Sequence, residues 1–170
     1  MKSITRFSAV FLFLVVFMFN SCSNEPIDPT LDPTAGNSNY YVKFKMDGVQ
    51  KTYTNTEATF MNVGPMGTLS IVGIEGLNSM NLHVMDQAVT VIGEGTYPLQ
   101  WTNVGCDFIE GSANYASDYQ DFTTSAGNIV ITEKNTSNKT VKGTFNFVGK
   151  NENMTQTRNF TEGDFFVRYE

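Results

Sequence analysis

From Tyr40 onward, apolar and polar residues alternate with a period of two, and this pattern restricts the fold more than any other feature of the sequence. In Tyr40–Met46 one face is expected to hold the apolar and aromatic residues and the other both lysines; the first set is Tyr40, Val42, Phe44 and Met46. Because successive side chains of a strand point to opposite faces of a sheet, this run predicts a half-buried strand. Asp47 and Gly48 tolerate the positive φ of a tight hairpin turn, so Val49–Tyr53 is the predicted partner strand.

The same alternation recurs later in the chain, and segments rich in glycine, asparagine and proline separate the predicted strands. These strands are Leu69–Ile71, Met80–Val84, Ile129–Thr132, Val141–Phe147 and Phe165–Tyr169. In the last of them the outward positions are polar, with the exception of Phe166. Predicted turns include Gly64-Pro65, Gly93–Gly95 and Glu162-Gly163.

The spacing of these segments is typical of an all-β protein with about nine or ten short antiparallel strands. No segment has the periodicity of a helix. We expect an antiparallel β-sandwich, and the alternative is a lipocalin-like β-barrel. Either arrangement covers or removes most of the exposed edges of the sheet.

The first residues of the chain have the three zones of a secretion signal. Lys2 and Arg6 are the positive zone, and the apolar run Phe7–Phe19 follows. A helix of that length spans about 20 Å, which is shorter than a hydrocarbon core of about 30 Å. Phe19-Asn20-Ser21-Cys22 resembles a bacterial lipobox, and this resemblance implies cleavage before Cys22 and a lipid on its sulfur.

The sequence therefore predicts three parts. Residues 1–21 are the expected signal peptide, residues 22–39 the lipidated cysteine with a flexible Pro-rich tether, and residues 40–170 a single all-β domain. Two or three acyl chains hold a protein on a bilayer without exchange. We thus expect a protein anchored to a membrane of the bacterial cell envelope, at the outer membrane on its periplasmic or surface face.

The net charge argues against nucleic-acid binding, and the cysteine content argues against a disulfide. Removal of the predicted signal peptide takes away Lys2 and Arg6 and no acid, so the formal charge falls from -6 to -8. An acidic chain of this kind is a poor partner for nucleic acid. A lipid on Cys22 leaves Cys106 without a partner in the chain, so we expect no disulfide and a packed thiol at Cys106.

Few residues carry the chemistry that catalysis or metal binding requires. The chain has one histidine, His83, which alternation places on the face opposite Leu82 and Val84. One histidine and one unlipidated cysteine do not provide the ligands of a closed zinc site. The chain also lacks a Gly-x-Ser-x-Gly elbow and a phosphate-binding glycine loop ahead of a helix. We expect no enzyme, no metal and no cofactor.

The segment from Tyr97 to Phe122 has an uneven composition, with many aromatic rings and acids and few aliphatic residues. Its candidate ligand-binding residues are Tyr97, Trp101, Asp107, Tyr115, Asp118, Tyr119 and Asp121. Ring faces stack on sugars while polar groups take hydroxyls, so a glycan site is one interpretation. Packing of these rings in the core is the interpretation that we favour, and a calcium loop is a further alternative, although the Asp-x-Asp-x-Asp spacing is absent.

Several strand and turn motifs occur together along the chain in an order that is similar to that of a known family. They are Met46-Asp47-Gly48, Gly95-Thr96-Tyr97-Pro98-Leu99, Gly127–Thr132, Val141–Phe147 and Thr161-Glu162-Gly163-Asp164-Phe165. In this order the chain resembles a family of Bacteroidetes lipoproteins of unknown function. The resemblance covers most of residues 40–170 and implies an all-β fold on a lipid anchor, with no activity to carry over.

These observations predict an envelope lipoprotein whose β domain is a non-enzymatic binding or interaction module. Its partners would be the membrane, through the lipid on Cys22, and a glycan or an envelope protein. The alternative is a structural or assembly subunit of an envelope complex. A carbohydrate-active enzyme using carboxylates such as Glu94 or Glu110 is the third possibility.

Overall fold

The computed structural model describes residues 39–100, 103–117 and 126–170, and the strands in these ranges are all antiparallel to their neighbours in the sheet. They are β1 (Tyr41–Met46), β2 (Val49–Tyr53), β3 (Asn55–Val63), β4 (Met66–Glu75), β5 (Asn78–Asp86), β6 (Gly95–Pro98), β7 (Val104–Glu110), β8 (Ala113–Ala116), β9 (Gly127–Asn135), β10 (Thr140–Asn151) and β11 (Thr157–Arg168). None of the described segments forms a helix that could span a lipid bilayer.

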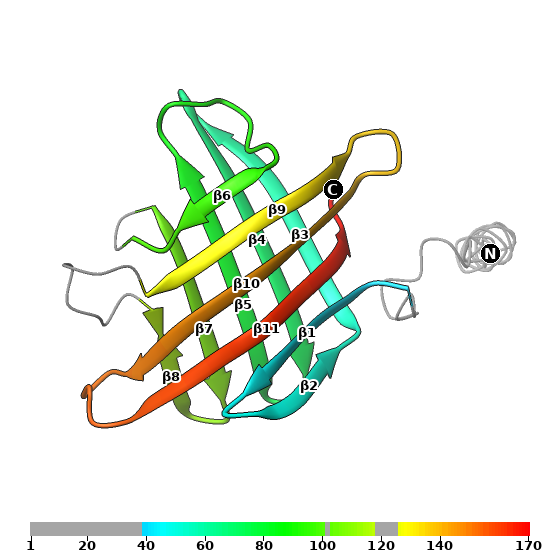
Figure 1. The fold of residues 1–170 in the computed structure, drawn as a ribbon. Coiled ribbons are helices and arrows are strands. Elements are labelled where there is room, and N and C mark those ends of the chain that lie inside the picture. The colour runs from blue at the N-terminus through cyan, green and yellow to red at the C-terminus, as the bar shows by residue number, and fades with distance from the viewer. Residues whose placement is uncertain (1–38, 101–102, 118–125) are drawn as a thin grey trace, which may run out of the picture. The chain divides into compact units, whose positions relative to one another are not determined.

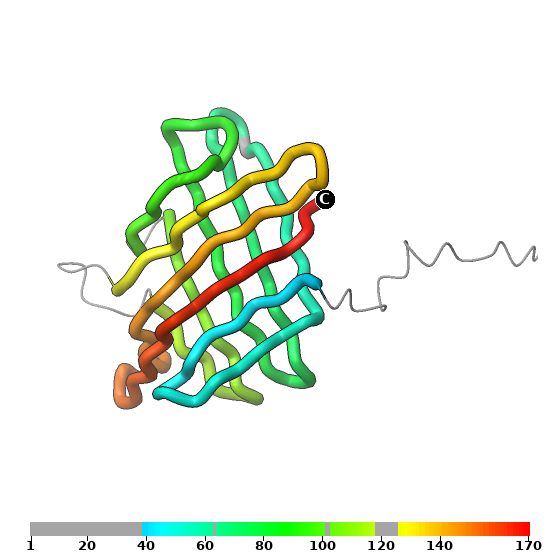
Figure 2. The backbone as a smooth tube through the Cα atoms, turned by 45° about the vertical axis from the view of Figure 1, so that its right-hand side comes forward, coloured from blue at the N-terminus to red at the C-terminus, as the bar shows by residue number. Residues whose placement is uncertain are grey.

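All of these strands belong to one sheet, in which β10 connects two layers. Its main path runs β2-β1-β11-β10-β8-β7-β5-β4-β3, and β9 and β6 continue from β10 on a branch. The first part of β10, Thr140–Phe147, pairs with β9, whereas Lys150 and Asn151 pair with β8. Figures 1 and 2 show the result: β6, β9, β10, β11, β1 and β2 form a front layer, and β3, β4, β5, β7 and β8 cross behind it.

The two layers also meet on their other side. Only Thr54 separates β2 from β3, so the chain passes directly from the front layer to the back layer. Ala58 of β3 forms a parallel bridge with Tyr169, and the N–H of Glu170 donates to the Ala58 carbonyl at 3.3 Å. The sheet is therefore nearly closed and barrel-like. The all-β prediction is confirmed, and this near-closure fits the barrel that we set beside the sandwich.

Aromatic rings from both layers fill the middle of the domain. The largest side chains with almost no exposed surface include Phe44, Tyr53, Phe108, Phe147, Phe160 and Phe165. Phe147 and Phe160 stack with their centroids 4.1 Å apart, and Phe44 meets the edge of Phe108 in the opposite layer at 5.7 Å. Because these rings occupy the interior, we expect a ligand site to lie on the outer surface.

One predicted turn is wrong in an informative way. Glu162-Gly163 lies inside β11, where Glu162 has φ 50° and the pairing shifts from Phe145 with Gly163 to Phe147 with Phe160. This shift is a β-bulge, which bends a strand without ending it. By contrast, the predicted turn at Asp47-Gly48 is present, with φ 49° and 86°.

Candidate ligand-binding groove

Several residues proposed from the sequence lie outside the described residues. They are Cys22, Trp101, Asp118, Tyr119 and Asp121. Of the predicted ligand-binding set, the structure therefore describes Tyr97, Asp107 and Tyr115.

Both of these tyrosines use their hydroxyl groups to support the fold. Tyr97, on β6, is half-buried and donates to the Gly93 carbonyl at 2.9 Å; burial raises the pKa of this phenol. Tyr115, on β8, is 3% exposed and donates to Oε1 of Gln156 at 2.8 Å. Both contacts hold local chain segments together, which corresponds to the core-packing interpretation.

Asp107 lies on a different surface from either tyrosine. It is on β7, half-buried, and accepts a hydrogen bond from Nδ2 of Asn81 at 2.7 Å. The next residue, Phe108, is buried directly opposite Tyr115, so Asp107 faces outward while Tyr115 faces the core. Tyr97 belongs to the front layer, where β6 pairs with β9. The structure does not bring these three side chains to one site.

His83 and Cys106 occupy neighbouring positions of β5 and β7, but their side chains lie on opposite faces of the sheet. His83 is exposed on β5 and lies over Gly105, where a Cβ would overlap the imidazole ring. Cys106 is a free thiol with 2% exposure, and burial raises its pKa, so it stays protonated and inert. Among the described residues, no three histidine, cysteine or acidic side chains are placed to hold a metal ion.

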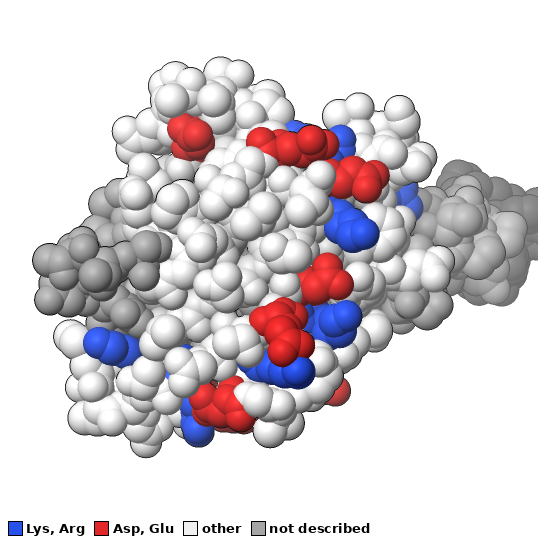
Figure 3. All heavy atoms as spheres, viewed as in Figure 1, with Lys and Arg blue, Asp and Glu red and all other residues white. Residues whose placement is uncertain are grey.

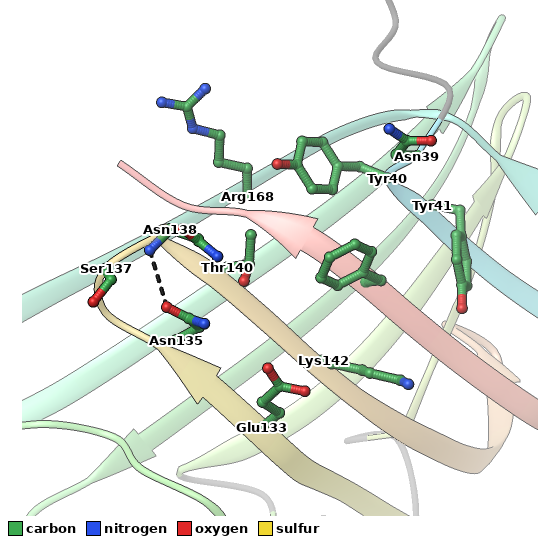
Figure 4. Close-up of a pocket in the computed structure, with 11 residues that line it drawn as sticks. Asn39, Tyr40, Tyr41, Glu133, Asn135, Ser137, Asn138, Thr140, Lys142 and Arg168 are labelled. Atoms are coloured by element: carbon green, nitrogen blue, oxygen red, sulfur yellow. Dashed lines mark hydrogen bonds between the residues drawn. The ribbon is translucent and has the colours of Figure 1, made fainter.

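A groove lies instead on the outer face of the front layer, beside the β9–β10 hairpin. It is open to solvent, with a volume of about 710 Å³ (Figure 4). Three stretches distant in sequence line it: residues 39–41, residues 133–142 and residues 166–168. Pairing of β1 with β11, and of β10 with both β11 and β9, brings them together.

The strand register aligns the residues at the base of the groove across four neighbouring strands. Glu133 of β9 pairs with Lys142 of β10, Lys142 with Phe166 of β11, and Phe166 with Tyr41 of β1. Tyr40, just before β1, packs against Phe166 with the ring centroids 5.3 Å apart at 62°. Alternation predicted Tyr40 on the inner face, but β1 begins one residue later and Tyr40 lines the groove.

Below the groove, charged side chains on the same face are paired. Figure 3 shows acids and bases alternating in a band across this view. The ion pairs are Lys43 with Asp164 at 3.6 Å, Lys45 with Glu162 at 2.7 Å and Arg158 with Asp47 at 2.9 Å. The Tyr41 hydroxyl donates to Asp164 at 2.9 Å, and burial together with this bond raises the pKa of Tyr41.

The charged side chains that line the groove differ from those below it, because they are not in ion pairs with one another. Glu133, Lys142 and Arg168 are all exposed, and none forms an ion pair with a described residue. The hairpin adds amide and hydroxyl groups from Asn135, Ser137 and Asn138. The groove thus combines half-buried rings with exposed charged, amide and hydroxyl groups that a ligand could contact.

Sequence reasoning did not find this groove, because its residues do not cluster along the chain. The single sequence signal was Phe166, an aromatic residue at an outward position of an otherwise polar strand face. Its outward position next to Tyr40 becomes meaningful only when the strand pairing is known.

Comparisons with known proteins identify a family and no function. Searches of curated proteins and of solved structures found no match to the chain. Residues 38–167 match a protein family described as a domain of unknown function, DUF6252, and the chain belongs to this family.

Proposed function

We propose that this protein is a lipid-anchored envelope lipoprotein whose β domain binds a glycan, without enzymatic activity, in the groove beside the β9–β10 hairpin. The observation that carries the proposal is the pair of half-buried rings, Tyr40 and Phe166, next to exposed charged and amide groups. Sugars present apolar C–H faces and a rim of hydroxyls, and aromatic rings with hydrogen-bonding groups complement both.

The number of acids favours binding over hydrolysis. Glycoside hydrolysis uses two carboxyl groups that flank the scissile bond. Among the described residues that line the groove, Glu133 is the one carboxylate. Asp164 lies nearby on β11 but is engaged by Lys43 and by the Tyr41 hydroxyl. This arrangement supports a site that holds a saccharide rather than one that cleaves it.

The place of the groove in the chain suits a displayed binding module. Asn39 and Tyr40, at the start of the described domain, line one end of it. The proposed lipid on Cys22 would anchor the chain on the N-terminal side of these residues. The hairpin residues at the other end would then remain available to a soluble or surface-attached glycan.

A glycan array probed with the full chain in mild detergent tests this function. We expect binding to a defined set of saccharides and weaker binding by a Phe166→Ala variant. Stacking of one ring contributes about 0.5–1.5 kcal/mol, so the affinity should fall by about 2- to 10-fold. Val148→Ala, another half-buried apolar position on the outer face of the front layer, serves as the matched control.

Two outcomes contradict the proposal. One is an array without binding, in which case crosslinking in cells that recovers a single envelope protein would favour the assembly-subunit alternative. The other is equal binding by the Phe166→Ala and Val148→Ala variants, which would place the saccharide elsewhere on the domain.

A further inference from the structure

We infer that the ligand of the groove is an acidic glycan, with a carboxylate bound by Arg168 and Lys142. This inference rests on the proposed glycan-binding function and specifies its ligand class. It starts from the distribution of charge on one face of the front layer.

On that face the acids of β11 and of the β1–β2 turn are neutralised by bases within the domain. Asp164, Glu162 and Asp47 each lie within 4 Å of a lysine or arginine. In the groove, two bases face a single acid and none of the three is in an ion pair with a described residue. The local balance is therefore positive, although the chain as a whole has a formal charge of -6.

The two bases are both close to Phe166 in the strand register. Lys142 is directly across from Phe166, and Arg168 is two residues beyond Phe166 on the same face of β11. Diagonal neighbours on adjacent antiparallel strands are about 7–8 Å apart. A sugar ring lying on Phe166, with Tyr40 beside it at an angle of 62°, could therefore direct a carboxylate toward Arg168 while Lys142 remains within reach of the same sugar residue or the next.

Arginine is well suited to this role. Its planar guanidinium donates two parallel hydrogen bonds to a carboxylate, a geometry that adds specificity as well as strength. Figure 4 shows the Arg168 side chain extending away from the ribbon at the end of β11. The guanidinium is exposed and forms no ion pair with a described residue.

Glu133 does not neutralise this positive charge. It pairs with Lys142 in the register, but Figure 4 shows the Lys142 side chain extending away from it, and the two form no ion pair. Asn135 Oδ1 accepts the N–H of Asn138 at 2.9 Å, which fixes the hairpin. The Glu133 carboxylate and the amide donor of Asn135 can then take sugar hydroxyls.

Titration calorimetry on the full chain in mild detergent provides the test. The probes are oligogalacturonate, a hyaluronan oligosaccharide and sialyllactose, each compared with its methyl ester, which keeps the sugar rings and removes the charge. We expect at least one acid to bind about 10-fold more tightly than its ester, and the difference to shrink as sodium chloride is raised. Arg168→Gln and Lys142→Gln should reduce binding of the acid to the level of the ester.

Lys150→Gln is the matched control, because Lys150 lies on the outer face of β10 outside the groove. It should leave both affinities unchanged. Equal binding of acid and ester, or a preference for neutral glycans on the array, would overturn this inference while the glycan-binding function stands. Absence of any glycan binding would overturn both. Binding to phosphatidylglycerol vesicles that depends on Arg168, without glycan binding, would assign the cations to a lipid phosphate and also refute the inference.

Discussion

Replacement of Phe44 by alanine should destabilise the domain more than most single substitutions. Phe44 is 0% exposed, and its ring contacts four others: Tyr53 at 5.5 Å, Phe108 at 5.7 Å, Phe160 at 6.0 Å and Phe145 at 6.2 Å. A buried Phe→Ala change costs about 3–5 kcal/mol, and lost ring pairs place this one in the upper half of that range. At about 4 kcal/mol, the Tm of a domain of this size should fall by about 12–20 °C.

Thermal unfolding followed by circular dichroism measures this effect on the full chain. Phe44→Leu fills most of the space and should give an intermediate shift, which keeps the prediction testable if the alanine variant does not fold. Val49→Ala, at a position 61% exposed on the neighbouring strand, should change the free energy of unfolding by less than about 0.5 kcal/mol. If Phe44→Ala melted within about 3 °C of Val49→Ala, the aromatic cluster would not be what joins the two layers.

Three further predictions concern other parts of the domain. Burial raises the pKa of Cys106, so a disulfide reagent at pH 8 should label this thiol only after unfolding, and rapid labelling of the native chain would contradict its position. The pKa of Asp47 is lowered by the backbone N–H of Asn159 and by the Arg158 guanidinium. Its stabilising effect should be present above about pH 4 and lost as the pH falls through the lowered pKa, so Asp47→Asn should reduce the Tm at pH 7, and this reduction should become smaller as the pH is lowered below 4. A Cβ at Gly163 would overlap a backbone carbonyl of β10, so Gly163→Ala should lower the Tm by about 3–10 °C, and an unchanged Tm would exclude the bulge geometry.

The period-two pattern located the strands where one face is buried and the other is charged. Tyr41–Met46 is such a strand, with Val42 and Phe44 buried and two lysines at the outward positions. The same pattern does not detect β3 (Asn55–Val63), because Ala58 is the one buried residue among Asn55–Asn62 and the strand lies at the end of the sheet. Local alternation is weak wherever a strand contributes little to the core.

At two other places the structure differs from the alternation and turn pattern of the sequence, because of contacts that the sequence does not reveal. In β7 (Val104–Glu110) the outward position Gly105 is buried because the His83 ring of β5 covers it, and the alternation is interrupted. At Glu162-Gly163, residues that favour a turn produce a bulge, since β10 runs alongside and its hydrogen bonds continue on both sides. In each case a neighbouring strand decides the local structure.

Composition does not distinguish a ring packed in the core from a ring on the surface, and the comparison of Tyr115 with Phe166 shows why. Tyr115 lies in the aromatic, acid-rich segment, yet its ring is buried and its hydroxyl is bonded to Gln156. Phe166 lies among charged residues on a strand face turned to solvent, where Tyr40 is the one aromatic residue of the described segments that pairs with it. A ring at an inward position of the apolar–polar alternation is explained by packing in the core. A ring at an outward position gives up the stabilisation that burial would have provided. An aromatic residue on the charged face of a strand is therefore a more specific indicator of a ligand surface than a local excess of aromatic residues.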